Sequence, residues 1–84
     1  MVARGVIVRG SALKHRIAAE DGIEAATRSV ITILLDDENP QRVMRLGFDT
    51  KSRLLETVVL LWDDGTEELI HVMKARPQYV RLLE

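Results

Sequence analysis

Glu56 and His71 are the two side chains of this sequence whose types and spacing suit acid–base chemistry. The dipeptide Asp64-Gly65 favours a two-residue hairpin turn between two strands. The resulting register pairs Glu56 with Met73 and Val58 with His71, so the carboxylate and the imidazole are diagonal neighbours on one sheet face. A carboxylate beside an imidazole orients the ring, and histidine changes its charge near neutral pH. We therefore expect an acid–base couple here.

This expectation has an alternative, which is a structural hydrogen bond between two polar groups on a partly exposed sheet face. Both interpretations require Asp63 to lie opposite Thr66 at the turn. A shift of one residue in the register would turn the two side chains to opposite faces of the sheet.

Basic and aromatic side chains cluster near the C-terminus of the chain. Arginine and lysine bind phosphate oxygens and stabilise negative charge that develops on phosphorus. An aromatic ring can stack on a nucleobase. The alternative is a solvated helix with the tyrosine as a packing residue. The candidates are Lys74, Arg76, Tyr79 and Arg81, with Lys14 and His15 of an N-terminal segment as further positive groups.

Several other chemistries are not supported by the sequence. The absence of cysteine excludes thiolate metal sites, disulfides and a cysteine nucleophile. There is no glycine-rich phosphate loop and no serine in a nucleophile elbow. His15 and His71 do not have a metal-binding spacing with the acidic residues, and Asp36-Asp37-Glu38 lacks the glycine of a calcium loop. We expect neither a metal nor a cofactor.

The 84 residues are enough for one domain, residues 1–84, and not for two hydrophobic cores. The ends of the chain are basic and its middle is acidic, and the net charge of −1 gives little long-range attraction to nucleic acid. The N-terminal apolar run is interrupted by charges and is too short for a signal peptide or a membrane span. We expect a cytoplasmic protein that associates with itself or a partner.

The pattern predicts an α+β fold with two N-terminal helices, a four-stranded antiparallel meander and a C-terminal helix. Residues 6–8 are extended, and β-branched runs, turn residues and capping residues give the remaining boundaries. One face of the sheet would carry Met44, Val58, Leu60 and Trp62, as core or as a partner surface. The predicted helices are 11–15, 18–29 and a last one from Pro77, and the predicted strands are 30–35, 42–49, 53–62 and 66–73.

Two segments and the element order resemble a known family, the BrnT-like toxins of bacterial type II toxin–antitoxin modules in the RelE-like ribonuclease superfamily. Leu13-Lys-His-Arg-Ile17, followed by the acidic segment Glu20-Asp-Gly-Ile-Glu24, is similar to the Lys-His-Gly-aliphatic motif of that family. Ile70-His-Val-Met-Lys-Ala-Arg76 stands in the place of its last strand. Three positions depart from the pattern: Arg16 replaces a glycine, Met73 an arginine and His71 a small hydroxyl residue.

The resemblance implies a RelE-like domain that cleaves RNA without a metal and is neutralised by an antitoxin, often a ribbon-helix-helix protein. Operator DNA would be bound only through that antitoxin. By position, Lys14 and His15 match the first motif and Lys74 matches the basic residue of the last strand. Glu56, His71, Lys74 and Arg76 are then the expected catalytic group.

Two other functions remain open at this stage. A chain of the same fold without catalysis could serve as the antitoxin-binding half of a repressor complex, and Met73 together with the acidic middle of the chain favours this alternative. A regulatory dimerisation domain is the third alternative, and no motif favours it.

Overall fold

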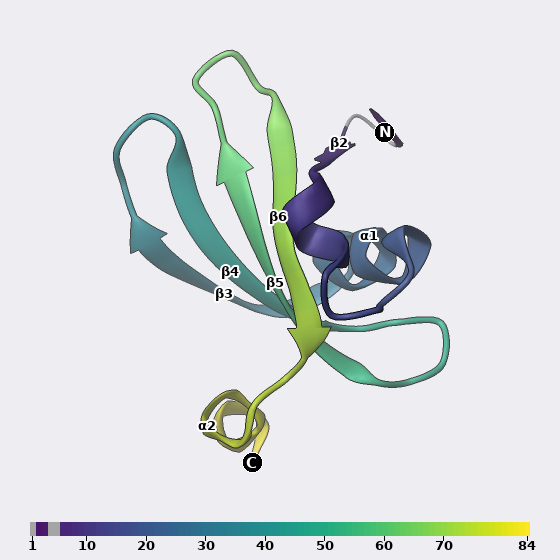
Figure 1. Cartoon of the computed structure of the whole chain (residues 1–84). Helices are drawn as coiled ribbons and strands as arrows, with labels where there is room; N and C mark the ends of the chain where they lie inside the picture. The colour runs from purple at the N-terminus through teal and green to yellow at the C-terminus, as the bar shows by residue number, and fades with distance from the viewer. Residues whose placement is uncertain (1, 4–5) are drawn as a thin grey trace.

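A computed structural model describes residues 2–3 and 6–84 of the chain, with the side chains of residues 6–84. Two short strands and a 3₁₀ turn precede one α-helix, four longer strands follow, and a short helix with a final 3₁₀ turn ends the chain (Figure 1). The elements are β1 (Val2–Ala3), β2 (Val6–Val8), η1 (Gly10–Leu13), α1 (Ala19–Thr27), β3 (Ser29–Asp36), β4 (Gln41–Phe48), β5 (Leu54–Leu61), β6 (Glu67–Lys74), α2 (Pro77–Val80) and η2 (Arg81–Leu83).

The strands form one mixed sheet in the order β1-β2-β6-β5-β4-β3. The predicted antiparallel meander is confirmed as β3 to β6, each strand pairing with the next along the chain. The predicted extended segment is the strand β2, which pairs with β6 in parallel, and β1 pairs with β2. The α+β class is therefore confirmed, and the sheet is larger than the predicted four strands.

The prediction of two N-terminal helices is wrong for the first of them. Gly10–Leu13 is a single 3₁₀ turn, and α1 is the only α-helix before the meander in the described residues. The Ser11 hydroxyl does not cap a helix, because it donates a hydrogen bond to the Ile70 carbonyl of β6. Arg16 then takes a positive φ of 63°, which ends the local helical path. The segment is thus tied to the sheet and is too short for an α-helix.

The main hydrophobic core lies between α1 and one face of the sheet (Figure 1). Gly22 of α1 lies against Val72 of β6, where a larger residue would meet the valine methyl groups. Ile23 and Ala26 complete the helix face, which explains the apolar spacing recognised in the sequence. The buried residues of this core are Val8, Ala12, Ile17, Ile23, Ala25, Ala26, Val43, Leu55, Val59, Leu69 and Val72.

Gly47 of β4 lies directly against the backbone of α1, and a Cβ atom here would overlap the Ala25 carbonyl oxygen. A backbone atom cannot swing aside as a side chain can, so Gly47→Ala is expected to lower the free energy of unfolding by about 2 kcal/mol. Gly10→Ala is the control, since that position has open space around it. Urea unfolding measures both, and equal stability of the two variants would contradict this packing.

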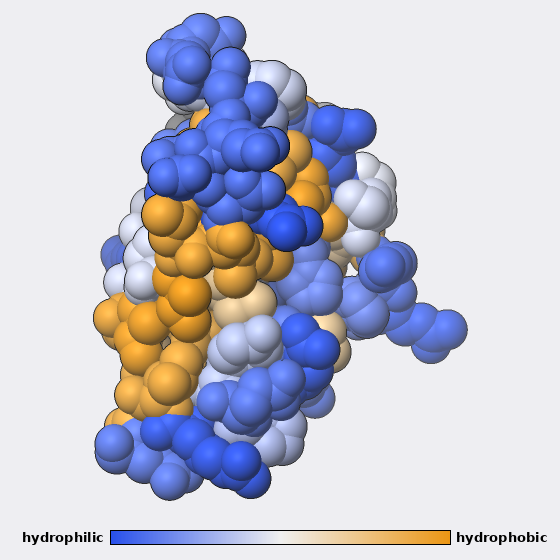
Figure 2. Space-filling view, turned by 90° about the vertical axis from the view of Figure 1, so that its left-hand side faces the viewer, coloured by the Kyte–Doolittle hydropathy of each residue, from blue (hydrophilic) through white to orange (hydrophobic). Residues whose placement is uncertain are grey.

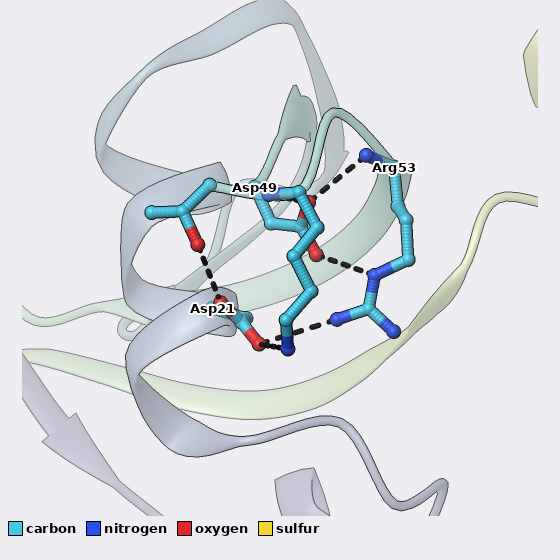
Figure 3. Close-up of polar contacts among 5 residues, drawn as sticks. Asp21, Asp49 and Arg53 are labelled. Atoms are coloured by element: carbon cyan, nitrogen blue, oxygen red, sulfur yellow. Dashed lines mark hydrogen bonds and ion pairs between the residues drawn. The ribbon is translucent and has the colours of Figure 1, made fainter.

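The loop between β4 and β5 is fixed to α1 by two buried carboxylates (Figure 3). Asp49 accepts hydrogen bonds from the backbone N–H groups of Lys51 and Arg53 and from Arg53 Nε at 2.7 Å. Asp21 of α1 accepts from Thr50, from Lys51 Nζ and from Arg53 Nη2 at 3.2 Å. All the polar atoms of these carboxylates are therefore engaged in holding the fold.

The other face of the sheet carries a second cluster of buried residues, Met44, Leu46 and Val58. Met44 lies opposite Val58, as the predicted shared face requires. Tyr79 of α2 packs against this cluster, and α2 lies at one end of the sheet, away from α1 (Figure 1). No helix in the described part of the chain has the length and apolar character needed to cross a bilayer.

Candidate active site

The predicted meeting of Glu56 and His71 is present in the structure. Glu56 lies opposite Met73 and Val58 lies opposite His71, as predicted. His71 Nε2 lies 3.1 Å from Glu56 Oε2. The two residues therefore form a hydrogen-bonded pair on the face that carries the second cluster.

The prediction of a two-residue turn at Asp64-Gly65 is wrong, because three residues, 63–65, connect the paired Trp62 and Thr66. Asp63 does not lie opposite Thr66, because the backbone N–H of Trp62 donates to the Thr66 carbonyl at 2.9 Å. The pairing is thus displaced by one residue near the turn and changes at Ile70, before the candidate site. This irregularity of β6 restores the predicted pairing at His71.

Glu56 is completely buried, and three of its four hydrogen bonds come from Arg76. The Arg76 backbone N–H and Nε both donate to Oε1 at 3.0 Å, and Nη2 donates to Oε2 at 2.8 Å. His71 supplies the fourth contact. Arg76 was predicted as a phosphate ligand. In the structure its guanidinium is paired with the Glu56 carboxylate and neutralises that charge.

The charge state of Glu56 follows from these contacts. Burial by itself raises the pKa of Glu56, but the hydrogen bonds from the Arg76 side chain and backbone and from His71 outweigh it. The pKa of Glu56 therefore lies below its ordinary value of 4.5. The same contact with Glu56 raises the pKa of Arg76. The pair is ionised at neutral pH.

Acid is expected to destabilise the protein through Glu56. Because its pKa is lower in the folded chain, the unfolded chain binds more protons, and stability falls as the pH drops from about 4.5 through the lowered pKa. Chemical unfolding at several pH values should show a flatter acid limb in Glu56→Gln than in the parent chain. Glu20→Gln, at an exposed position of α1, is the control. An unchanged acid limb in Glu56→Gln would contradict the lowered pKa.

The ionised Glu56 also determines which nitrogen of His71 carries the proton. A carboxylate only accepts hydrogen bonds, so His71 Nε2 must donate to Glu56 Oε2. The neutral imidazole then has its lone pair on Nδ1. With 24% of its side chain exposed, His71 is accessible to a ligand. The arrangement is that of a general base positioned by a carboxylate.

A pocket of about 450 Å³ opens beside this pair. Four apolar side chains line it, together with two arginines, a histidine and a tyrosine. The Arg76 guanidinium carbon lies 5.4 Å from the centre of the Tyr79 ring, in cation–π contact. The lining residues are Leu35, Arg42, Met44, Val58, Ile70, His71, Arg76 and Tyr79.

His15 follows the 3₁₀ turn η1, and its ring lies beside His71 of the candidate site. Its ring meets that of His71 edge to face, with 5.4 Å between the centroids. His15 is therefore the member of the N-terminal motif that joins the candidate site. Among the described residues, no group of three or more His, Asp or Glu side chains is arranged to hold a metal ion.

The other predicted site residues are not all brought together. Lys74 lies opposite Leu55, whose side chain belongs to the core beneath α1. Because successive residues of a strand point to opposite faces, Lys74 points away from the face that holds Glu56 and His71. Lys14 and Arg81 are exposed and make no side-chain hydrogen bond or ion pair with the described residues. Lys74 thus does not belong to the pocket.

Arg42 is a site residue that the sequence reasoning missed. It lines the pocket and lies opposite Leu60, two positions before Met44 on the same face of β4. The predicted pairing of Met44 with Val58 contained the signal, because residues two apart on a strand share a face. Within the described chain Arg42 makes no ion pair. It is the pocket arginine whose charge is not compensated by a carboxylate.

The described structure defines a small α+β domain with a hydrogen-bonded His71–Glu56 pair beside a pocket of mixed polar and apolar lining. Comparisons with models of known protein families, with characterised proteins and with solved structures found no match to this chain.

Proposed function

We propose that this chain is an endoribonuclease that cleaves RNA without a metal ion and inhibits translation as the toxin of a type II toxin–antitoxin pair. The observation that carries the proposal is His71, held on the ionised Glu56 with Nδ1 as its free acceptor, beside two arginines and a tyrosine. The resemblance to BrnT-like and RelE-like toxins supports the same reaction. Cleavage of RNA by its own 2′-hydroxyl needs only proton transfer and charge stabilisation.

In the proposed reaction His71 is the general base. Nδ1 takes the proton of the 2′-hydroxyl as the 2′-oxygen forms its bond to phosphorus. His15, in ring contact with His71, gives a proton to the departing 5′-oxygen as its bond to phosphorus breaks. The products are a 2′,3′-cyclic phosphate and a 5′-hydroxyl.

The remaining pocket residues bind and orient the RNA. Arg42 and the outer part of Arg76, whose side chain is 46% exposed, stabilise charge on the phosphate oxygens. Tyr79 stacks on a base next to the cleaved bond. Glu56 is a positioning residue, because a buried carboxylate with a lowered pKa and four hydrogen bonds is a poor proton acceptor.

The partners of the proposed toxin are RNA and an antitoxin of ribbon-helix-helix type, both met in the bacterial cytoplasm. Operator DNA is bound by the antitoxin and not by this chain. The net charge of −1 favours this arrangement, because it gives the isolated chain little attraction to a DNA duplex.

The proposal is tested by tightly induced expression in a bacterial host, with growth and total RNA followed together. Arrest with loss of RNA is expected for the parent chain, and His71→Ala should relieve it at equal protein level. Lys74→Ala is the matched control, because Lys74 points to the opposite face and should leave arrest unchanged. Undisturbed growth with folded parent protein would contradict the proposal.

Two observations favour a second function. Two guanidinium nitrogens of Arg76 are engaged by Glu56, and Met73 stands where the pattern of the BrnT-like toxins places another arginine, so few cations remain for phosphate. This favours a catalytically inactive module that acts in an antitoxin-containing repressor complex. Such a module would bind its antitoxin equally well with or without His71, and it would leave RNA intact.

A further inference from the structure

Among residues 6–84, the two most exposed large hydrophobic side chains lie on β3. β3 ends the sheet, and no described strand pairs with its outer side. Val30 and Leu34 of this strand are each 55% exposed. Seen from this side of the molecule, hydrophobic residues form a continuous band (Figure 2). An edge strand of this kind offers unpaired backbone N–H and C=O groups to another strand.

We propose that this edge is the interface of a homodimer, in which β3 of one copy pairs antiparallel with β3 of a second copy. The sequence of β3 is complementary to itself about Thr32. With Thr32 on the two-fold axis, Ile31 lies opposite Ile33 twice, within the part of β3 that pairs regularly with β4. Apolar residues therefore meet on both sides of the axis.

Charge complementarity favours the antiparallel pairing. Arg28 is the C-cap of α1 immediately before β3 and Asp36 ends β3, so antiparallel pairing brings the basic end of one copy near the acidic end of the other, twice by symmetry. Arg28 also bridges Glu24 of its own chain, with 78% of its side chain exposed, so its guanidinium can reach a second carboxylate.

The shape of β3 favours a closed dimer over a fibre. Its pairing with β4 is irregular between Ser29 and Ile31 and between Leu34 and Asp36, which leaves a short regular stretch in the middle. Only that stretch can pair smoothly with a neighbour. Because both copies use the same edge, the pairing covers both β3 edges and cannot propagate.

The test is sedimentation velocity of the full chain over concentrations from about 1 µM to about 500 µM, a range that covers ordinary self-association constants. The parent chain should pass from monomer to dimer. Leu34→Lys, which places a charge on the edge strand, should shift the midpoint at least about 10-fold. Lys14→Asp, on an exposed position away from β3, is the control and should not shift it.

A charge exchange tests the antiparallel pairing. Arg28→Asp and Asp36→Arg each bring like charges near one another at both ends of the paired strands, so each variant should self-associate about 10-fold more weakly. Mixing the two variants makes both contacts complementary again and should give a heterodimer of about parental affinity. Circular dichroism confirms that each variant is folded. A folded parent chain that stays monomeric would overturn the proposal and leave this edge to another partner, such as a strand of an antitoxin. A dimer that mixing the two variants does not strengthen would overturn the proposed antiparallel pairing.

Discussion

Purified protein carrying His71→Ala is expected to cleave RNA about 10²-fold to 10⁴-fold more slowly than the parent chain, which is the usual contribution of a general base. His71 is the group in the pocket with an unoccupied acceptor nitrogen, since Nε2 is engaged by Glu56. The change removes that acceptor and leaves the buried Glu56–Arg76 pair in place. The measurement is the rate of cleavage of a defined oligoribonucleotide under single-turnover conditions.

Two further variants separate catalysis from folding in this experiment. Lys74→Ala removes a positive charge of β6 from the opposite sheet face and should cleave at the parental rate. Glu56→Gln keeps the side chain's shape but no longer fixes the His71 tautomer, so it should alter the pH dependence of cleavage as well as its rate. A His71→Ala chain that cleaves as fast as the parent would remove His71 from the mechanism.

Arg76→Met is expected to lower the free energy of unfolding by about 3 kcal/mol, because it leaves a buried carboxylate without its cation. Glu56 has no exposed surface with which to recover water, and Arg76 provides three of its four hydrogen bonds. The backbone contact survives the substitution, and the two guanidinium contacts do not. Urea unfolding at neutral pH measures the loss.

The control for this prediction is Arg81→Met, at an exposed arginine of η2, which should change stability by no more than about 0.5 kcal/mol. Adding Glu56→Gln to Arg76→Met removes the stranded charge and should recover more than half of the lost stability. Equal stability of Arg76→Met and Arg81→Met would contradict the claim that the Glu56–Arg76 ion pair stabilises the folded chain.

Local sequence signals were sufficient for the meander. The β-branched run at 30–35 predicted β3, and Asp64-Gly65 predicted the turn between β5 and β6, although that turn has three residues instead of two. The Met44–Val58 pair lies on one face as predicted. The parallel pairing of β2 with β6 was not predictable in this way, because Val6 and Glu67 are far apart in the sequence. A short extended segment has no local sequence feature that identifies the strand with which it pairs.

The Glu56–His71 pair of the candidate site was predictable from the sequence, and the positions of Lys74 and Arg76 around it were predicted less well. Glu56 and His71 followed from strand alternation, and the same rule applied to Lys74 would have placed it on the other face. The engagement of Arg76 by Glu56 depends on how the chain turns back after β6, which no spacing rule gives. Likewise, nothing in the spacing of Asp21 and Arg53 shows that they meet beneath the loop after β4.

The most direct test of His71-based RNA cleavage is to incubate the purified chain with a defined oligoribonucleotide in a chelator and identify the product ends by mass spectrometry. The proposed mechanism predicts a 2′,3′-cyclic phosphate and a 5′-hydroxyl from the parent chain, and loss of both with His71→Ala. Intact RNA with the folded parent chain, or products with a 3′-hydroxyl and a 5′-phosphate, would contradict it.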